Sequence, residues 1–301
     1  MSSNDGGTTF VMPCPPGERY TDPSAYPPPE QPLDFLHVDD QIVVVVKPAF
    51  LPSKNGRHLD DSVLSRVASE LTLRDEPTAG LHLAHRLDWE TSGVLVLART
   101  TAAMRSLSAQ FESRSVKKVY IADIAGVRGP QCASGCISLP MSPDPDRRPL
   151  QRIDFGATGR SCSTHYTVID SCLGAWRIRL EPLSGRTHQL RVHMLAAFGC
   201  PIVGDALYGQ FGNSAEAPLQ QTVLVRLQCL ATSGEAVRVR CTSSPHVGVL
   251  GTRGDCTSTR LHLHAAELSF AHPKTGALMT FCSEPTFQLP SALHSCGVWR
   301  A

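Results

Sequence analysis

Uninterrupted runs of apolar residues predict a chain built largely from short buried strands. β-Branched and aliphatic residues in runs of four to eight favour strands with both faces covered. The unbroken runs occupy residues 42–46 and 94–98, and the strand-like segments that also contain polar residues occupy 119–125, 165–169, 176–180, 261–270 and 279–282. The run at 176–180 also alternates apolar and basic residues, a pattern typical of a half-buried strand.

Helical spacing of apolar residues occurs in three places between these strands. Asp60 and Asp61 precede apolar positions 63, 64, 67 and 71, which predicts a capped amphipathic helix. Thr100 is placed to cap a second helix, with apolar positions 103, 104, 107 and 111 on one face. Residues 187–198 fit a third helix, which Gly199 and Pro201 would end.

The remaining segments differ in amino-acid composition, and these differences suggest domain boundaries. Residues 1–37 are rich in Pro and poor in large apolar residues, so we expect a disordered arm. One domain is expected over 38–290, with 210–259 as an insertion containing two strand-like runs, and 291–301 as a C-terminal tail. Residues 132–159 are rich in turn-forming residues and are expected to form loops.

Composition narrows the class of protein. Apolar residues make up 42% of the 301 and charged residues 18%, so the chain as a whole is not expected to be disordered. No apolar run is long enough to span a bilayer, and the first residues lack the pattern of a secretory signal. Eleven Cys without such a signal favour reduced thiols, which predicts an intracellular protein of undetermined compartment.

Charge is unevenly distributed although the net charge is only +1. Residues 99–191 hold 14 Lys and Arg against 7 Asp and Glu, whereas residues 1–98 hold 7 against 14. A basic middle segment could face phosphates, and Arg forks suit phosphate geometry. From charge alone, a bias in Arg usage explains the pattern equally well.

Few catalytic or metal-binding motifs are present. The sequence lacks a phosphate-binding Walker loop, a dinucleotide-binding Gly-rich loop and a zincin motif. Cys132 and Cys136 have no second Cys or His pair at metal-binding spacing, so no metal is expected. The polar segment 85–93 remains, in which Asp88 lies two residues after Arg86 and could act as a nucleophile kept ionised by a cation. By residue type alone, a structural turn is the simpler interpretation.

Six segments together resemble RNA pseudouridine synthases of the RluA type. His85-Arg86-Leu87-Asp88 with Thr91-Ser92-Gly93 resembles the catalytic signature of that family. The other matching segments follow in the family's order: 40–48, 118–126, 185–193, 201–205 and 261–273. The resemblance implies an α+β fold, with a mixed, mostly antiparallel sheet flanked by helices and a catalytic cleft across the sheet. It also implies isomerisation of uridine in ribosomal or transfer RNA, without cofactor or metal, by a monomer.

The resemblance also assigns roles to residues. Asp88 corresponds to the nucleophile, Tyr120 to the residue that stacks on the target base, and Arg186 to the cation that pairs with Asp88. Arg86 would occupy the space left by the extruded base, and His85 would hold a phosphate or order the turn. Apolar Leu190 would form a pocket wall or pack in the core. Basic residues expected to contact RNA or to have structural roles are Arg191, Lys117 and Lys118.

Two departures and two alternatives accompany this interpretation. No segment corresponds to an N-terminal S4-like RNA-binding module, and Phe50 stands where the family commonly has Gly. One alternative is a catalytically silent RNA-binding or RNA-chaperoning protein with the same fold. Another is a glycoside hydrolase that uses Asp88 and Glu90 as a carboxylate pair.

Overall fold

The computed structural model describes residues 29–56, 60–126, 129–172, 174–209 and 260–289, and the backbone of two short strands between 210 and 259. The first part contains β1 (Asp34–Val38), β2 (Ile42–Lys47), α1 (Val63–Leu73), β3 (His82–Leu83), β4 (Ser92–Ala98) and α2 (Thr101–Glu112). The middle contains β5 (Lys117–Ala125), β6 (Ser134–Ser138), β7 (Met141–Pro143), β8 (Gln151–Ile153), β9 (Ser163–Cys172), β10 (Ala175–Pro182) and α3 (Gln189–Phe198). The last part contains β11 (Arg226–Leu227), β12 (Val237–Arg238), β13 (Leu263–Ala271) and β14 (Leu278–Cys282).

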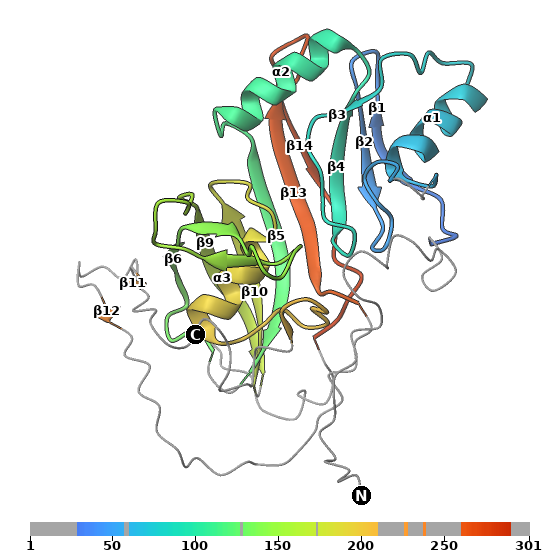
Figure 1. The fold of residues 1–301 in the computed structure, drawn as a ribbon. Coiled ribbons are helices and arrows are strands. Elements are labelled where there is room, and N and C mark those ends of the chain that lie inside the picture. Colours follow the sequence, from blue (N-terminus) through green and yellow to red (C-terminus); the bar gives the residue numbers. More distant parts are fainter. Residues whose placement is uncertain are drawn as a thin grey trace, which may run out of the picture.

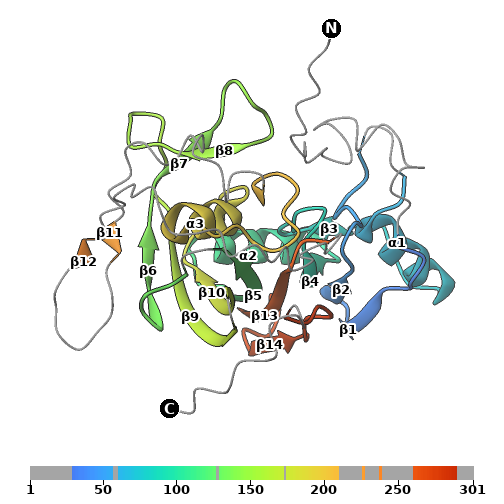
Figure 2. The same ribbon diagram turned by 90° about the horizontal axis from the view of Figure 1, so that it is seen from below.

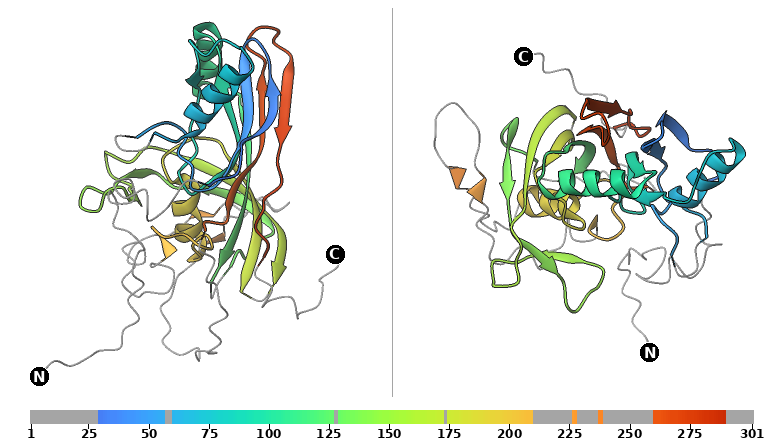
Figure 3. Two further views of the ribbon diagram at one scale, coloured as in Figure 1. Left: turned by 90° about the vertical axis from the view of Figure 1, so that its right-hand side faces the viewer. Right: turned by 90° about the horizontal axis from the view of Figure 1, so that it is seen from above.

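Within the described residues, one mixed sheet organises the molecule (Figure 1). Its strand order is β1-β2-β4-β13-β5-β10-β9-β6, with β14 paired to β13 and β3 paired to β4. All pairings in this sheet are antiparallel except that of β13 with β4. The two views in Figure 3 show the strands as a twisted layer, as the right-handed twist of L-peptide strands requires. The predicted α+β fold is thus confirmed.

The parallel contact between β4 and β13 requires a glycine. Gly93 pairs with Ala265 and has a φ of 119°, a value that disfavours any side chain. A Cβ at this position would lie 2.3 Å from the carbonyl oxygen of Ala265. The last residue of the predicted catalytic signature therefore lets two strands from distant parts of the sequence approach each other.

Alternate residues of β2 and β4 pack in two separate cores, as the two-residue period of a strand dictates. Val43, Val45, Leu95 and Leu97 pack with the buried face of α1. The intervening residues of both strands pack in the cluster that holds α2. Both strands are buried along nearly their whole length, which explains their unbroken apolar sequences.

Helix α3 lies between the sheet and the β7–β8 hairpin (Figure 2). Leu190, Met194 and Phe198 pack against β5 and β10. Val192 and Leu195 pack instead in the cluster formed with the hairpin. Because the helix is covered on both sides, even its polar residues Gln189, Arg191 and His193 are buried.

Helix boundaries partly match the sequence predictions. Thr100 accepts a hydrogen bond from the amide of Ala103 and caps α2 as predicted, and Gly199 ends α3 with a φ of 66°. The predicted start of the first helix is wrong, because Ser62 rather than Asp60 or Asp61 is its N-cap. The predicted start of the third helix is also too early, since α3 begins at Gln189 after a left-handed His188.

Two loop predictions need correction, and two others fall largely outside the described residues. Residues 132–159 contain β6, β7 and β8 rather than loops alone. Strand β1 includes residues 34–37, which the sequence pattern assigns to the disordered arm. Within the predicted insertion at 210–259, only the short strands β11 and β12 are described, and the tail at 291–301 is outside the described residues.

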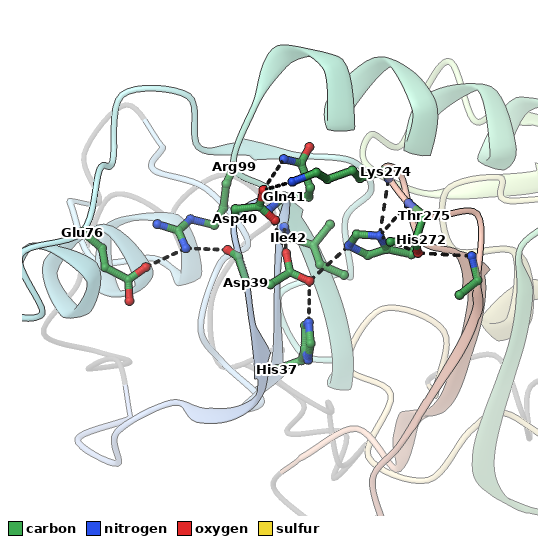
Figure 4. A network of polar contacts seen from close by, with 11 residues as sticks. His37, Asp39, Asp40, Gln41, Ile42, Glu76, Arg99, His272, Lys274 and Thr275 are labelled. Carbon is green, nitrogen blue, oxygen red and sulfur yellow. Dashed lines mark hydrogen bonds and ion pairs between the residues drawn. The ribbon is translucent and has the colours of Figure 1, made fainter.

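A polar network links two turns at the end of the sheet farthest from α3 (Figure 4). The Asp39 carboxylate accepts hydrogen bonds from the amides of Gln41 and Ile42, and its Oδ2 lies 2.6 Å from His37 Nε2 and 3.1 Å from His272 Nε2. Burial would raise the pKa of Asp39, but the bonds from His37 and the backbone outweigh it and lower the pKa to about 2. The network therefore joins the β1–β2 turn to the β13–β14 turn.

None of the helices in these described segments is long and apolar enough to cross a lipid bilayer.

Candidate active site

A cavity of about 510 Å³ is lined by three segments that are far apart in the sequence, and also by the end of α2 with Arg114 and by Leu263 of β13. The first is the loop 84–91 between β3 and β4, which we call the catalytic loop. The second is the start of β5, and the third is the loop 182–188 with the first turn of α3. Asp88, Tyr120 and Arg186 come one from each segment and all line this cavity. The structure therefore brings the three predicted catalytic residues to one place.

Asp88 is half-buried in a turn of the catalytic loop. The amide of Thr91 donates a hydrogen bond to the carbonyl oxygen of Asp88 at 3.1 Å, which closes the turn. Thr91 also lines the cavity, and its hydroxyl is buried with no hydrogen-bond partner among the described residues. One turn thus carries both a carboxylate at the cavity and an unpaired hydroxyl.

Lys47 stabilises the backbone of the catalytic loop from the interior of the protein. Its Nζ is fully buried and donates to three carbonyl oxygens, those of Pro48, Leu51 and Trp89, at 2.9, 2.7 and 3.1 Å. Burial lowers the pKa of Lys47 to about 7, and the nearby Asp88 carboxylate opposes this shift. The lysine therefore fixes the residue that follows Asp88.

Tyr120 reaches the cavity from the middle of the sheet. It is half-buried on β5, paired with Ala265 of β13 and Leu180 of β10. Burial raises the pKa of Tyr120, and the charge of Asp88 raises it further. The phenol is consequently neutral at physiological pH and lines the same cavity as Asp88.

Arg186 is exposed and lies just before α3. Its amide donates to the side-chain oxygen of Gln189 at 3.1 Å, and the Ser184 hydroxyl donates to the same oxygen at 2.8 Å. No ion pair links Arg186 to Asp88 in the described part of the chain. The backbone of Arg186 is thus held in place while its guanidinium remains at the rim of the cavity.

The two residues before Leu87 differ in exposure and in contacts. Arg86 is exposed at the rim of the cavity. The Nε2 of His85 accepts a hydrogen bond from the amide of Val96 at 3.2 Å, and its ring stacks on Phe111 at 4.6 Å. Burial, with a smaller effect of Lys118, lowers the pKa of His85 to about 3. A neutral acceptor in these contacts favours the expectation that His85 orders the turn.

The predicted binding residues on β5 and α3 occupy different environments. Lys118 lines the cavity, donates to the carbonyl of Ser184 at 3.2 Å and has its pKa lowered by burial. Lys117 is not part of the lining and forms an ion pair with Glu267 at 2.9 Å. Leu190 both lines the cavity and belongs to the core, so the two predicted roles coexist.

Arg191 points into the protein rather than out to solvent. Its Nε and Nη2 donate to the two carboxylate oxygens of Asp205, and Nη2 lies 3.1 Å from Glu90 Oε2. Burial opposes ionisation, but Asp205 and Glu90 outweigh it and raise the pKa of Arg191. With 2% of its surface exposed, Arg191 is placed to tie α3 to the catalytic loop instead of contacting RNA phosphates.

Sequence reasoning missed several residues that shape this site. Asp205 also accepts from the amides of Leu207 and Tyr208 at 2.9 Å, and the Tyr208 hydroxyl lies 2.9 Å from His188 Nδ1. Burial lowers the pKa of His188 to about 4, so this cavity residue is neutral. Asp205 belongs to the segment 201–205 that resembles the family, but the sequence assigned no role to it.

Comparisons with known proteins agree with this arrangement. The sequence profile of the family described as RNA pseudouridylate synthase matches residues 41–196. The chain is 37% identical over 266 residues to the dual-specificity RNA pseudouridine synthase RluA of Escherichia coli K12, covering 87% of this chain and 98% of that protein. The same enzyme of Haemophilus ducreyi is 35% identical over 267 residues, with the same coverage. The chain belongs to the RluA-type RNA pseudouridine synthases. It is accordingly an isomerase that converts uridine in RNA to pseudouridine.

Solved structures agree at the level of the fold. The human RNA pseudouridylate synthase domain containing 4 has a TM-score of 0.57 and 25% identity, covering 84% of this chain and 88% of that one. The human RNA pseudouridylate synthase domain containing 1 has the same TM-score at 24% identity, covering 86% and 85%.

The glycoside hydrolase alternative is wrong. Glu90 is buried and its Oε2 is paired with Arg191, so it does not form a second carboxylate facing a substrate beside Asp88. Family membership excludes that reaction class independently.

Proposed function

We propose that this chain isomerises specific uridines in ribosomal RNA, transfer RNA or both, with Asp88 as the nucleophile acting on a base flipped out of the RNA. The observation that carries the proposal is the convergence of Asp88, Tyr120 and Arg186 on one cavity from segments 32 and 66 residues apart. The sequence resemblance implies these two RNA classes, and the relatives that align over nearly their whole length are named dual-specificity RNA pseudouridine synthases.

Base flipping follows from where the reacting group lies. Asp88 is half-buried inside the cavity, whereas a uridine in a stem or stacked loop presents neither face of its ring to such a group. Extruding the base costs a few kcal/mol of lost stacking. The exposed guanidinium of Arg86, at the rim next to Asp88, is placed to stack in the vacated space and recover part of that cost.

Isomerisation exchanges one bond at the ribose for another. The bond between N1 and C1′ breaks, the uracil turns, and C5 bonds to C1′ and then loses its proton. Asp88 acts as a carboxylate, by attack at C1′ or C6 or by promoting a glycal route, and is regenerated at the end. Overall, the atoms of the nucleotide are conserved and no electrons are gained or lost.

The other cavity residues hold the base while it turns. Tyr120 offers a neutral aromatic ring on which uracil stacks, and Leu190 offers an apolar wall. Arg186 reaches from the rim toward Asp88 when RNA fills the cavity and keeps the carboxylate ionised. Arg191 and Lys47 act as positioning residues, because they hold the helix and the loop on which these groups stand.

Site-resolved mapping of pseudouridine in total RNA tests this function. We expect one or more pseudouridines to disappear from cells lacking the chain, to return with the wild-type chain, and to stay absent with Asp88→Asn. The control Asp60→Asn removes an exposed carboxylate outside the cavity and should restore modification fully.

Binding measurements with the same variants separate catalysis from silent RNA binding. We expect Asp88→Asn to bind the mapped RNA within about threefold of wild type, because the carboxylate contributes to the transition state more than to the ground state. Full modification by Asp88→Asn would refute the assigned nucleophile. Unchanged pseudouridine maps in the absence of the chain would favour the silent RNA-binding alternative.

A further inference from the structure

A second cavity, of about 600 Å³, adjoins the active cavity along the catalytic loop. His85, Arg86 and Leu87 line both cavities, so a wall about one side chain thick separates them. The far side of the second cavity is formed by the loop 52–56, by one residue of α1, by β3 with Leu81, and by one residue of α2. We call this space the loop cavity.

The lining of the loop cavity combines an aromatic wall, an apolar floor and polar edges. Trp89, which follows Asp88 in sequence, provides the aromatic wall. Aliphatic and thioether side chains provide the floor: Leu64, Leu81, Leu83 and Met104. Lys54 and His82, both exposed, and Asn55 provide polar groups. A flat aromatic ligand with hydrogen-bonding edges and a neighbouring negative charge fits such a lining, and a nucleobase with its phosphate has those properties.

The aromatic wall is held in a fixed orientation. The ring of Phe50 packs edge-on against Trp89 at 5.1 Å, and the amide of Phe50 donates to the Trp89 carbonyl at 2.8 Å. Phe50 has a φ of 64°, in the left-handed region that favours glycine, which is the residue common at this position in the family. The chain thus keeps a strained backbone at a position where Phe supports Trp89.

The loop cavity is also coupled mechanically to the catalytic loop. The Ser53 hydroxyl donates to the carbonyl of Leu87 at 3.0 Å and accepts from its amide at 3.2 Å. Lys47 bonds the carbonyls of both Leu51 and Trp89. A ligand that contacts Trp89 and the loop 52–56 would therefore affect the position of the segment that carries Asp88.

We propose that the loop cavity binds a second, unpaired base of the same RNA strand, close in sequence to the target uridine, and that Trp89 stacks on it. The inference rests on the proposed function for the identity of the ligand as RNA. Because the two cavities share Arg86 at their rim, a strand with one base in each would run past that guanidinium. The loop cavity then selects uridines by the presence of a second extrudable base nearby.

The experiment uses RNA hairpins with randomised loops, selected for binding to the full-length Asp88→Asn chain. Each loop position of a selected hairpin is then made abasic in turn. We expect one abasic position other than the reactive uridine to weaken binding about tenfold, the effect of losing one base–aromatic stack. With Trp89→Leu added to the chain, the same abasic change should weaken binding less than about twofold, while Trp89→Phe should retain most of the effect. Phe155→Leu, which alters an aromatic residue exposed by 65%, is the control.

The outcomes separate this proposal from the proposed function. If every abasic position has the same effect whether or not the chain carries Trp89→Leu, the loop cavity does not hold a base. If wild-type enzyme leaves the selected hairpin unmodified although the loop-cavity effect is present, the proposed function of the active cavity fails while the loop-cavity proposal stands. Photocrosslinking from a 5-iodouridine at the sensitive position to the otherwise native chain covers the case in which Trp89→Leu does not fold. A crosslink in the peptides holding residues 52–56 or Trp89 supports the proposal, and a crosslink elsewhere overturns it.

Discussion

In the catalytic loop, Thr91 has a buried hydroxyl that makes no hydrogen bond to the described residues. Thr91 lines the active cavity, and such a buried group costs about 1–3 kcal/mol of folding free energy. The backbone of Thr91 meanwhile closes the turn at Asp88. A destabilising group in the same turn as the proposed nucleophile is typical of a residue that gains its partner only when substrate is bound.

Replacing Thr91 tests this interpretation. We expect Thr91→Val to raise the free energy of unfolding by about 1 kcal/mol, because it removes the unpaired hydroxyl at nearly constant shape. The same change should lower kcat about tenfold, by loss of one hydrogen bond in the transition state, whereas Thr91→Ser should restore most of the activity. Denaturant titrations and single-turnover rates measure the two effects, and a stabilised Thr91→Val enzyme of full activity would contradict the assigned role.

Lys117 and Lys118 are adjacent in sequence but should differ in their contribution to RNA binding. Lys118 lines the active cavity, whereas Lys117 pairs with Glu267 outside it. We expect Lys118→Ala to reduce the slope of log binding constant against log salt by about 0.7, the loss of one phosphate contact on a single strand. Lys117→Ala should leave that slope unchanged. Binding titrations at several salt concentrations measure both, and equal slopes for the two variants would refute the distinction.

At the scale of single residues, the sequence indicated the candidate catalytic residues but not the buried ion pairs that hold them in place. The sequence around Asp88, Tyr120 and Arg186 resembles family segments, so the three could be named together. The inward orientation of Arg191 could not, because its partners Glu90 and Asp205 are 101 and 14 residues away and meet it only in the folded chain. Arginine serves both in exposed contacts with RNA and in buried ion pairs, and only its burial in the folded chain distinguishes the two roles.

Among the elements, the pairing of β4 with β13 sets the position of the catalytic loop. The loop is followed directly by Ser92 and Gly93, the first two residues of β4, which pair with His264 and Ala265. The Ser92 hydroxyl lies 2.9 Å from His264 Nδ1 and accepts a bond from Arg260 at 2.8 Å. The segment just before β13 and β13 itself therefore fix the C-terminal end of the loop that carries Asp88.

Adding one methyl group at Gly93 should disrupt this contact. We expect Gly93→Ala to lower the free energy of unfolding by at least about 3 kcal/mol, since the Cβ would meet the Ala265 backbone and φ is positive. The matched control is Gly276→Ala, whose φ of 72° is also positive but whose Cβ would meet nothing within 4 Å. Its cost should be only about 1 kcal/mol. Equal losses in thermal or denaturant unfolding would show that close approach is not what requires Gly93.

Elements were predictable from sequence where composition and burial agree. Strands β2 and β4 are buried on both faces, and their unbroken apolar runs identified them. Strands β6 and β7 were missed because they are short and contain Ser, Gly and Pro, which local sequence assigns to turns. Strand β8 was missed because its three residues are too few to show a pattern. The order of strands was not predictable, because the insertion of β13 between β4 and β5 depends on contacts across about 170 residues.

Across the whole molecule, several buried histidines are held neutral. Burial lowers the pKa of His85 to about 3, and that of His188, His193 and His264 to about 4. His85 and His188 line the active cavity. His193 hydrogen-bonds to Thr164 beneath α3, and His264 to Ser92 where β13 meets β4. The fold therefore depends on imidazoles that make hydrogen bonds in the neutral form, and His193 and His264 use both ring nitrogens.

Stability should consequently fall in mild acid. As pH drops below about 6.5 the unfolded chain takes up protons that the folded chain does not, so the stability contributed by neutral histidines is present above about pH 6.5 and lost toward about pH 4. Each group contributes up to about 1.4 kcal/mol per pH unit. We expect His193→Gln to flatten the dependence by about that amount, and the exposed His82→Gln to leave it unchanged. Denaturant unfolding across this range of mildly acidic pH measures the slopes, and parallel curves for wild type and His193→Gln would refute the assignment.

The central place of β13 has a consequence for the order of synthesis. Asp88 stands on the side of β1, β2 and β4, while Tyr120 and Arg186 stand on the side of β5 and β10, and β13 is the strand that joins the two sides within the sheet. A nascent chain that has not yet delivered residues 263–271 holds every assigned catalytic group but lacks the seam that brings them together. We therefore expect the nascent enzyme to stay inactive toward neighbouring RNA until β13 has emerged and paired with both β4 and β5.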